Sequence, residues 1–182
     1  MKIWAILVHH ILMIFSREYR EKYLCEMQTQ VCIDNIAVMR SRDDHPRDVI
    51  VRWVEKYTRS YDVQFQLVAQ CLLNEHNLYL TELAVKLDPT LCIQAVDQLL
   101  HAARAMRVND DATGSYSSVT AIDFVASAHK ISAQGNVLLT PELFARMQSI
   151  ISHAAYIAVH LMPEDYPQML YLKANGFHFR SE

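Results

Sequence analysis

Histidine side chains are the first groups in this sequence to consider for binding a metal ion or transferring a proton. Nine histidines occur among 182 residues. His9 and His10 are adjacent, so a helix would point them to different faces. His153 and His160 lie two helical turns apart, about 10.5 Å along a helix axis, which is too far to share one ion without other ligands. The spacing therefore predicts structural or surface histidines and no metal site.

The other reactive side chains also lack the spacing that catalysis requires. Glu75 and His76 lack the second histidine of an HExxH zinc site. Ser115, Ser117 and Ser118 lie in a polar loop without the glycine-flanked signature of a serine hydrolase. Four cysteines are scattered along the chain, at Cys25, Cys32, Cys71 and Cys92. Because none of them form a CxxC pair, we expect buried free thiols. From all these residue types together we predict a protein that is not an enzyme and has neither catalytic residues nor a cofactor.

The elements that position the functional groups are expected to be helices. Three glycines and five prolines leave little room for tight hairpins or glycine-rich phosphate loops. Residues 3–15 form an apolar stretch that is too short for a membrane span, which needs about 20 residues. Lys2 and this apolar run also resemble the start of a secretory signal, but two histidines interrupt the run and no small-residue cleavage site follows. We expect a buried or interface helix in a cytoplasmic protein, with no membrane contact.

Caps and helix breakers predict where the later helices begin. Thr81 is suited to cap a helix that follows residues 78 and 79. Asp88 and Pro89 end that helix, and Asp88 can cap the next one. Thr140 and Pro141 have the residue types of an N-cap and a first helical position, followed by a strongly apolar helix.

The central segment, residues 62–111, shows a specific order of elements. Helices are expected over about 63–76, in LYLTELA (78–84) and in a third segment that ends in LLHAARAMRV (99–108). The turn-forming run NDDATGSYSS (109–118) follows, and two strands, around Met106 and Val108 and around 119–125, would fit on either side of it. This order resembles the winged helix-turn-helix of MarR-like transcriptional regulators.

The resemblance implies a mainly α fold built on a winged helix-turn-helix core of three helices and a small β-hairpin. Residues 1–61 would be N-terminal helices, residues 62–125 the winged lobe, and residues 126–182 C-terminal helices and a tail that pack on the N-terminal helices in one compact unit. The terminal helices would form a dimerisation or support layer. The implied function is a DNA-binding transcriptional regulator that acts as a homodimer. The side chains expected at the DNA are Thr90, Gln94, Gln98, His101, Arg104, Arg47 and Arg52.

Charge argues against DNA as the partner. Residues 62–123 contain three basic and eight acidic residues, a net charge of −5. Affinity for a phosphate backbone comes mainly from Lys and Arg, so this lobe has the wrong sign. Asp97, which falls among the predicted DNA-facing residues, would repel phosphates unless it accepts from a cytosine amino group. The alternative is a non-catalytic winged-helix or helical adaptor that has lost DNA binding and binds a protein partner.

A ligand-responsive regulator would also need a cavity between its dimer helices and its winged lobe. Large apolar side chains from both regions could line such a cavity. The candidates for this pocket are Trp53, Tyr57, Phe65 and Met147.

Overall fold

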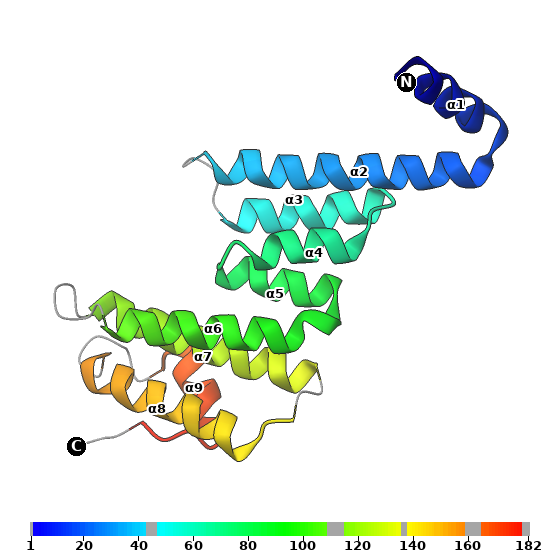
Figure 1. The fold of residues 1–182 in the computed structure, drawn as a ribbon. Coiled ribbons are helices and arrows are strands. Elements are labelled where there is room, and N and C mark those ends of the chain that lie inside the picture. Colours follow the sequence, from blue (N-terminus) through cyan, green and yellow to red (C-terminus); the bar gives the residue numbers. More distant parts are fainter. Residues whose placement is uncertain (1, 43–46, 109–114, 136–137, 159–164, 180–182) are drawn as a thin grey trace. The chain divides into compact units, whose positions relative to one another are not determined.

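The computed structural model describes residues 2–42, 47–108, 115–135, 138–158 and 165–179 (Figure 1). Every regular element in these residues is a helix, so the expectation of a mainly helical fold is confirmed. The chain divides into two compact units, Met1–Leu72 and Leu73–Glu182. This division lies between residues 72 and 73, whereas the sequence suggested boundaries after residues 61 and 125.

The first unit contains the helices α1 (Lys2–Phe15), α2 (Arg17–Arg40) and α3 (Arg47–Ser60) and most of α4 (Phe65–Leu73). Ser16 separates the first two helices and caps α2, because its hydroxyl oxygen accepts a bond from the Tyr19 amide at 3.2 Å. The Thr29 hydroxyl accepts a bond from the Gln64 amide at 2.8 Å and so ties α2 to the start of α4. The core between these helices is apolar and includes Cys32, Ile36, Ile50, Val54, Val68, Ala69 and Leu72.

The four cysteines are free thiols, as expected, although only two of them are buried. Cys32 lies in the core of the first unit, where burial raises its pKa to about 11. Cys92 lies in the second unit, donates its S–H to the Ile131 carbonyl at 3.2 Å, and also has a pKa raised by burial. Both thiols are therefore protonated at neutral pH and are poor nucleophiles.

The second unit contains α5 (Leu78–Leu87), the short 3-10 turn η1 (Pro89–Leu91), α6 (Cys92–Val108), α7 (Ser115–Gln134), α8 (Pro141–Ala158) and α9 (Pro167–Ala174). The helices α6 and α7 run in opposite directions and pack along most of their lengths, while α8 and α9 pack on α7 (Figure 1). The buried side chains include Leu99, Leu100, Ile122, Val125, Met147, Ile150, Ile151 and Leu172.

Two of the three predicted helix starts are confirmed. The Asp88 carboxylate accepts from the Thr90 amide at 3.0 Å and caps η1, which leads into α6. The Thr140 hydroxyl accepts from the Leu143 amide at 3.2 Å, and α8 begins at Pro141. The third prediction is wrong, because Asn77 caps α5 by accepting from the amides of residues 79 and 80, and Thr81 is buried within the helix. Asn77 lies one residue before the helix, whereas Thr81 already belongs to its first turn.

The expected β-hairpin is wrong in the residues that the structure describes. Met106 and Val108 belong to the end of α6, and residues 119–125 lie within α7. The reason is the helical spacing of small and apolar residues in α7, where Ala121, Val125 and Ala128 are almost fully buried. This stripe packs on α6, and a strand would turn every second residue away from it. The turn-forming residues 109–114 lie outside the described part of the chain.

The two terminal apolar helices have different environments. Helix α8 buries Met147, Ile151 and Ala154 inside the second unit, on α6 and α7. Helix α1 contacts α2 but leaves Trp4 and Phe15 largely exposed. Within the described residues, no helix is both long enough and apolar enough to cross a membrane.

Candidate functional site: a groove along helix α6

Helix α6 has one buried face and one exposed face, and the exposed face carries the predicted DNA-contacting residues. Leu99, Leu100 and Ala103 are buried against the rest of the second unit. The opposite face is largely exposed and mostly polar. Ile93 is an apolar residue on this face, and 66% of it is exposed. The buried stripe therefore fixes the helix and orients the polar face outward.

A groove of about 930 Å³ lies on this outer face. Most of its lining comes from α6, and single residues come from the segment before α5, from η1 and from α8. The lining residues are His76, Thr90, Ile93, Gln94, Asp97, Gln98, His101, Ala102 and Arg146. Four of the predicted DNA-contacting residues, Thr90, Gln94, Gln98 and His101, thus lie together in one site.

An ion pair joins the two helices that border the groove. Arg146 Nη1 of α8 donates to Asp97 Oδ1 of α6 at 2.8 Å, and the two side chains are 36% and 62% exposed. A pair this exposed stabilises the fold by at most about 1 kcal/mol. Its main effect is local, because the charge of Asp97 is balanced, and with neutral histidines the lining has no net charge.

The hydrogen-bonding capacity of the groove is only partly used within the chain. Gln98 Oε1 is shielded from solvent and accepts no hydrogen bond from any residue that the structure describes. The Thr90 hydroxyl donates to Asp88 Oδ1 at 2.7 Å, so toward a ligand it can act only as an acceptor. A shielded acceptor without a donor is costly, and a rotation of the Gln98 side chain that let it accept from a ligand N–H or O–H group would remove that cost.

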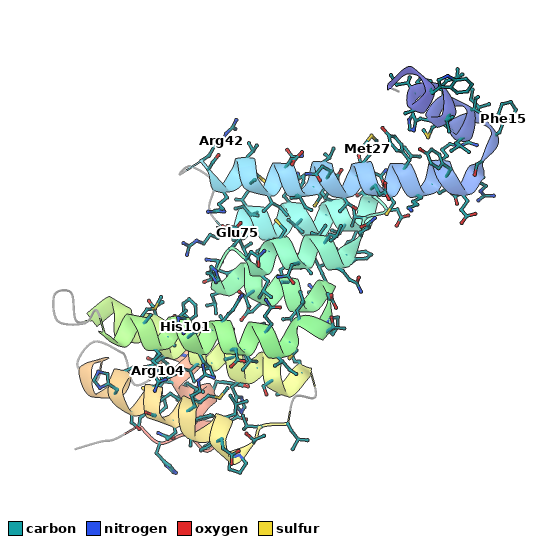
Figure 2. All side chains as sticks on the ribbon, in the orientation of Figure 1. Phe15, Met27, Arg42, Glu75, His101 and Arg104 are labelled. Atoms are coloured by element: carbon teal, nitrogen blue, oxygen red, sulfur yellow. The ribbon has the colours of Figure 1, made fainter. Side chains whose placement is uncertain are left out.

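The remaining DNA-contact candidates lie outside this groove. Arg104 is exposed on α6 one turn beyond His101, and both are labelled in Figure 2. Arg47 and Arg52 belong to α3 in the first unit, where Arg52 forms an exposed ion pair with Asp48. The groove therefore contains the four uncharged residues predicted to contact DNA and none of the three predicted arginines.

The predicted ligand-pocket residues are distributed between the two units. Trp53 and Tyr57 stack on each other in α3, with ring centroids 4.8 Å apart. Phe65 begins α4 and is 45% exposed. Met147 is fully buried in α8 of the second unit. Of the four predicted pocket residues, Trp53 and Tyr57 thus contact each other as a stacked pair on one helix of the first unit.

A row of polar contacts on α7 could be mistaken for a second site. Tyr166 donates to Asp123 Oδ1 at 2.6 Å, and Ser127 donates to Glu82 Oε1 at 2.6 Å. His129 Nδ1 lies 2.8 Å from the Tyr171 hydroxyl. Burial raises the pKa of Asp123 despite its bond from Tyr166, and burial lowers the pKa of His129. Each group is satisfied by a neighbouring helix, so these contacts hold α5 and α9 on α7.

The groove has the chemistry of a binding surface. Amides, an alcohol, imidazoles and a paired arginine and aspartate can form hydrogen bonds with a ligand. In the described part of the chain, no three His, Cys, Asp or Glu side chains are placed to hold a metal ion. Sequence reasoning missed His76 and Arg146, because Arg146 reaches Asp97 from 49 residues away and no local spacing records that contact. Comparisons of this chain with protein families, with curated proteins and with solved structures gave no match.

Proposed function

We propose that this protein is a non-catalytic helical adaptor that binds a polypeptide segment of a partner protein in the groove along α6. The observation that carries the proposal is the shielded Gln98 Oε1, which has no donor within the described residues and belongs to a residue that lines the groove. Peptide N–H groups are the donors that a protein partner supplies in regular succession. The amide of Gln94, one turn before Gln98, can both donate to and accept from the same peptide.

The size and lining of the groove suit a short extended segment. The side of the lining that η1 and α6 form runs from Thr90 to Ala102, which is about 18 Å at 1.5 Å per residue. An extended peptide of five or six residues has that length. Ile93 and Ala102 offer apolar contacts between the polar groups, so peptide side chains and backbone would both find complementary surface.

A dimeric DNA-binding regulator is the second candidate, and one observation favours it. Thr90 of η1 and Gln94 and Gln98 of α6 line one groove, and the order α5, η1 and α6 is the order that a helix-turn-helix would have. Threonine and glutamine can read base edges from such a position. In the residues that the structure describes, α6 and α7 occupy the positions expected for the two wing strands, and the second unit contains seven Lys and Arg against eleven Asp and Glu, a net charge of −4. This charge favours a protein partner.

The adaptor proposal is tested by replacing Gln98 with a residue of similar size that cannot accept a hydrogen bond. Peptides selected from a random displayed library on the full chain should bind the Gln98→Leu variant at least about 10-fold more weakly, because one buried hydrogen bond to a peptide N–H is lost. Titration calorimetry measures the affinity. The melting temperature of this variant should be unchanged or higher, since the substitution removes an acceptor that has no partner.

The matched control is Gln134→Leu, which makes the same change at an exposed position on α7 of the same unit. This variant should bind the selected peptides as tightly as the wild type. Equal affinity of the wild type and the Gln98→Leu variant for every selected peptide would contradict peptide binding at this groove.

A further inference from the structure

Helix α1 exposes more apolar surface than a helix of an isolated protein normally does. Trp4 and Phe15, near its two ends, are 73% and 81% exposed. The aliphatic side chains between them are 36% to 66% exposed, and they are Ile6, Leu7, Val8, Ile11, Leu12 and Ile14. A helix that is apolar around most of its circumference is normally covered on most sides.

One side of α1 is already occupied by α2. His9 Nδ1 lies 2.9 Å from the Tyr19 hydroxyl, and the His9 ring contacts the Tyr23 ring with centroids 4.8 Å apart. On the side away from His9, Trp4 is followed by Leu7, Ile11 and Ile14, at spacings of three, four and three residues. This is the spacing of the apolar seam by which two helices pack together.

The outer face of α2 continues the same kind of seam. Leu24, Met27 and Val31 are spaced three and four residues apart and are 38%, 45% and 42% exposed. They lie on a different side of the helix from its buried residues Cys32 and Ile36. Figure 2 shows Met27 on the edge of α2 that faces away from α3. The exposed seam is therefore a second face of α2, separate from the one that forms the core.

We propose that two copies of this chain associate through α1 and the outer face of α2, with their apolar seams packed together in a two-fold helical bundle. The exposed apolar side chains of these two helices present on the order of 800 Å², with large aromatics at about 150–250 Å² each. That is the area one partner contributes to an interface of standard size. It is also larger than the exposed apolar patch of a typical monomer, roughly 300–600 Å².

Charge favours a second copy over a lipid surface. Of the charged residues in the first turns of α2, Arg17 pairs with Glu21 at 2.7 Å and Lys22 with Glu26 at 4.0 Å, while Arg20, four residues before Leu24, is exposed at the start of the seam. A helix that lies on a membrane surface needs a strongly cationic polar face, and α1 has no charged residue after Lys2.

The test is sedimentation equilibrium of the full chain and of two isoleucine variants. Ile14 on α1 and Ile93 on α6 are both 66% exposed, so Ile14→Glu and Ile93→Glu are the same change at equal exposure in different units. The wild type should be a dimer whose dissociation constant rises at least about 100-fold in the Ile14→Glu variant, because the symmetric interface would contain two carboxylates. The Ile93→Glu variant should associate like the wild type.

A second variant, Trp4→Glu, repeats the test at the other end of α1, and circular dichroism checks that each variant keeps its helix content. A wild type that is monomeric at all concentrations would overturn the proposal, as would equal dissociation by Ile93→Glu. Binding of a monomeric wild type to vesicles of phosphatidylcholine and phosphatidylserine would assign α1 to a lipid surface and also overturn it.

Discussion

His129 is a buried histidine whose surroundings make the second unit sensitive to acid. Its Nδ1 atom meets the Tyr171 hydroxyl at 2.8 Å, and burial lowers its pKa below the ordinary value of 6.5. The folded state therefore disfavours the protonated imidazole, which the unfolded state accepts freely. The stability that depends on neutral His129 is fully present above pH 6.5 and is lost as the pH falls through the lowered pKa of the folded state.

We expect the His129→Asn variant to lose less stability than the wild type between pH 7.5 and pH 5.0. Asparagine places a hydrogen-bonding atom near the position of Nδ1 but does not titrate in this range. Urea unfolding at both pH values measures the difference. Asp123 shifts stability in the opposite direction, because burial raises its pKa from the ordinary 3.8, but it is present in both proteins and cancels. Identical pH dependence of the two proteins would rule out the role of His129.

Individual caps show what the sequence reveals about single residues and what it does not. Asp88 and Thr140 were predictable because each is followed directly by a proline, which restricts the chain to very few conformations. Asn77 was missed because residues 74–77 contain two asparagines and no proline, so the sequence offers several positions at which a helix could begin. A cap without a neighbouring breaker is weakly specified by residue type alone.

At the scale of elements, the packing of α6 on α7 depends on the absence of a side chain at Gly135. A Cβ atom added at Gly135 would lie 2.3 Å from Cys92 Sγ and 3.2 Å from the Ile131 carbonyl oxygen. We expect Gly135→Ala to destabilise the protein by about 1–3 kcal/mol, because the start of α6 and the end of α7 must move apart. The midpoint of urea unfolding measures this change.

A double-mutant cycle identifies the contact that causes the loss. In a Cys92→Ala background the sulfur is absent, and Gly135→Ala should cost clearly less than it does in the wild type. Gly176→Ala is the control, since Gly176 has a positive φ of 86° and no atom within 4 Å of an added Cβ. Its cost comes from backbone strain, about 1 kcal/mol, and should be the same with or without Cys92. An additive result for Gly135 and Cys92 would contradict the predicted clash.

The helices were more predictable than the way in which they pack. The apolar spacing of α3, α6 and α8 was visible in the sequence, and these helices are present. The failure at residues 119–125 has a physical cause, because the polar run before them indicates a break but does not specify the element that follows it. Val119, Ile122 and Val125 also suit a strand, and α6 decides the outcome by offering a helical surface on which Ala121 and Val125 become buried.

At the scale of the whole molecule, the candidate site was half predictable. Thr90, Gln94, Gln98 and His101 share one face because four- and three-residue spacing follows the turn of a helix. The other wall could not be found from spacing, since Arg146 and His76 come from other parts of the second unit. The fold that brings them to α6 is set by long-range packing, and no segment of the sequence records it.

The charge of the molecule predicts its behaviour toward nucleic acid. With a net charge of −3 for the chain and −4 for its second unit, the full protein should show no salt-sensitive retention on heparin or on random duplex DNA at 50 mM salt. A DNA-binding protein with six to ten phosphate contacts would lose about 10³–10⁵ in affinity between 50 and 200 mM salt. Retention that falls this steeply, and that Arg104→Ala weakens further, would favour the regulator over the adaptor.

The alkylation rates of the two buried thiols report how often each unit unfolds locally. Cys32 lies in the core of the first unit and Cys92 in that of the second, so each unit contains one shielded sulfur. An alkylating reagent such as iodoacetamide reacts with the thiolate and must reach it, so each sulfur is modified only when its own unit unfolds locally. Mass spectrometry of peptides containing Cys32 and Cys92 then yields two separate rates. Equal rates at both sulfurs would mean that the two units open as one cooperative body, and different rates would mean that each opens by itself.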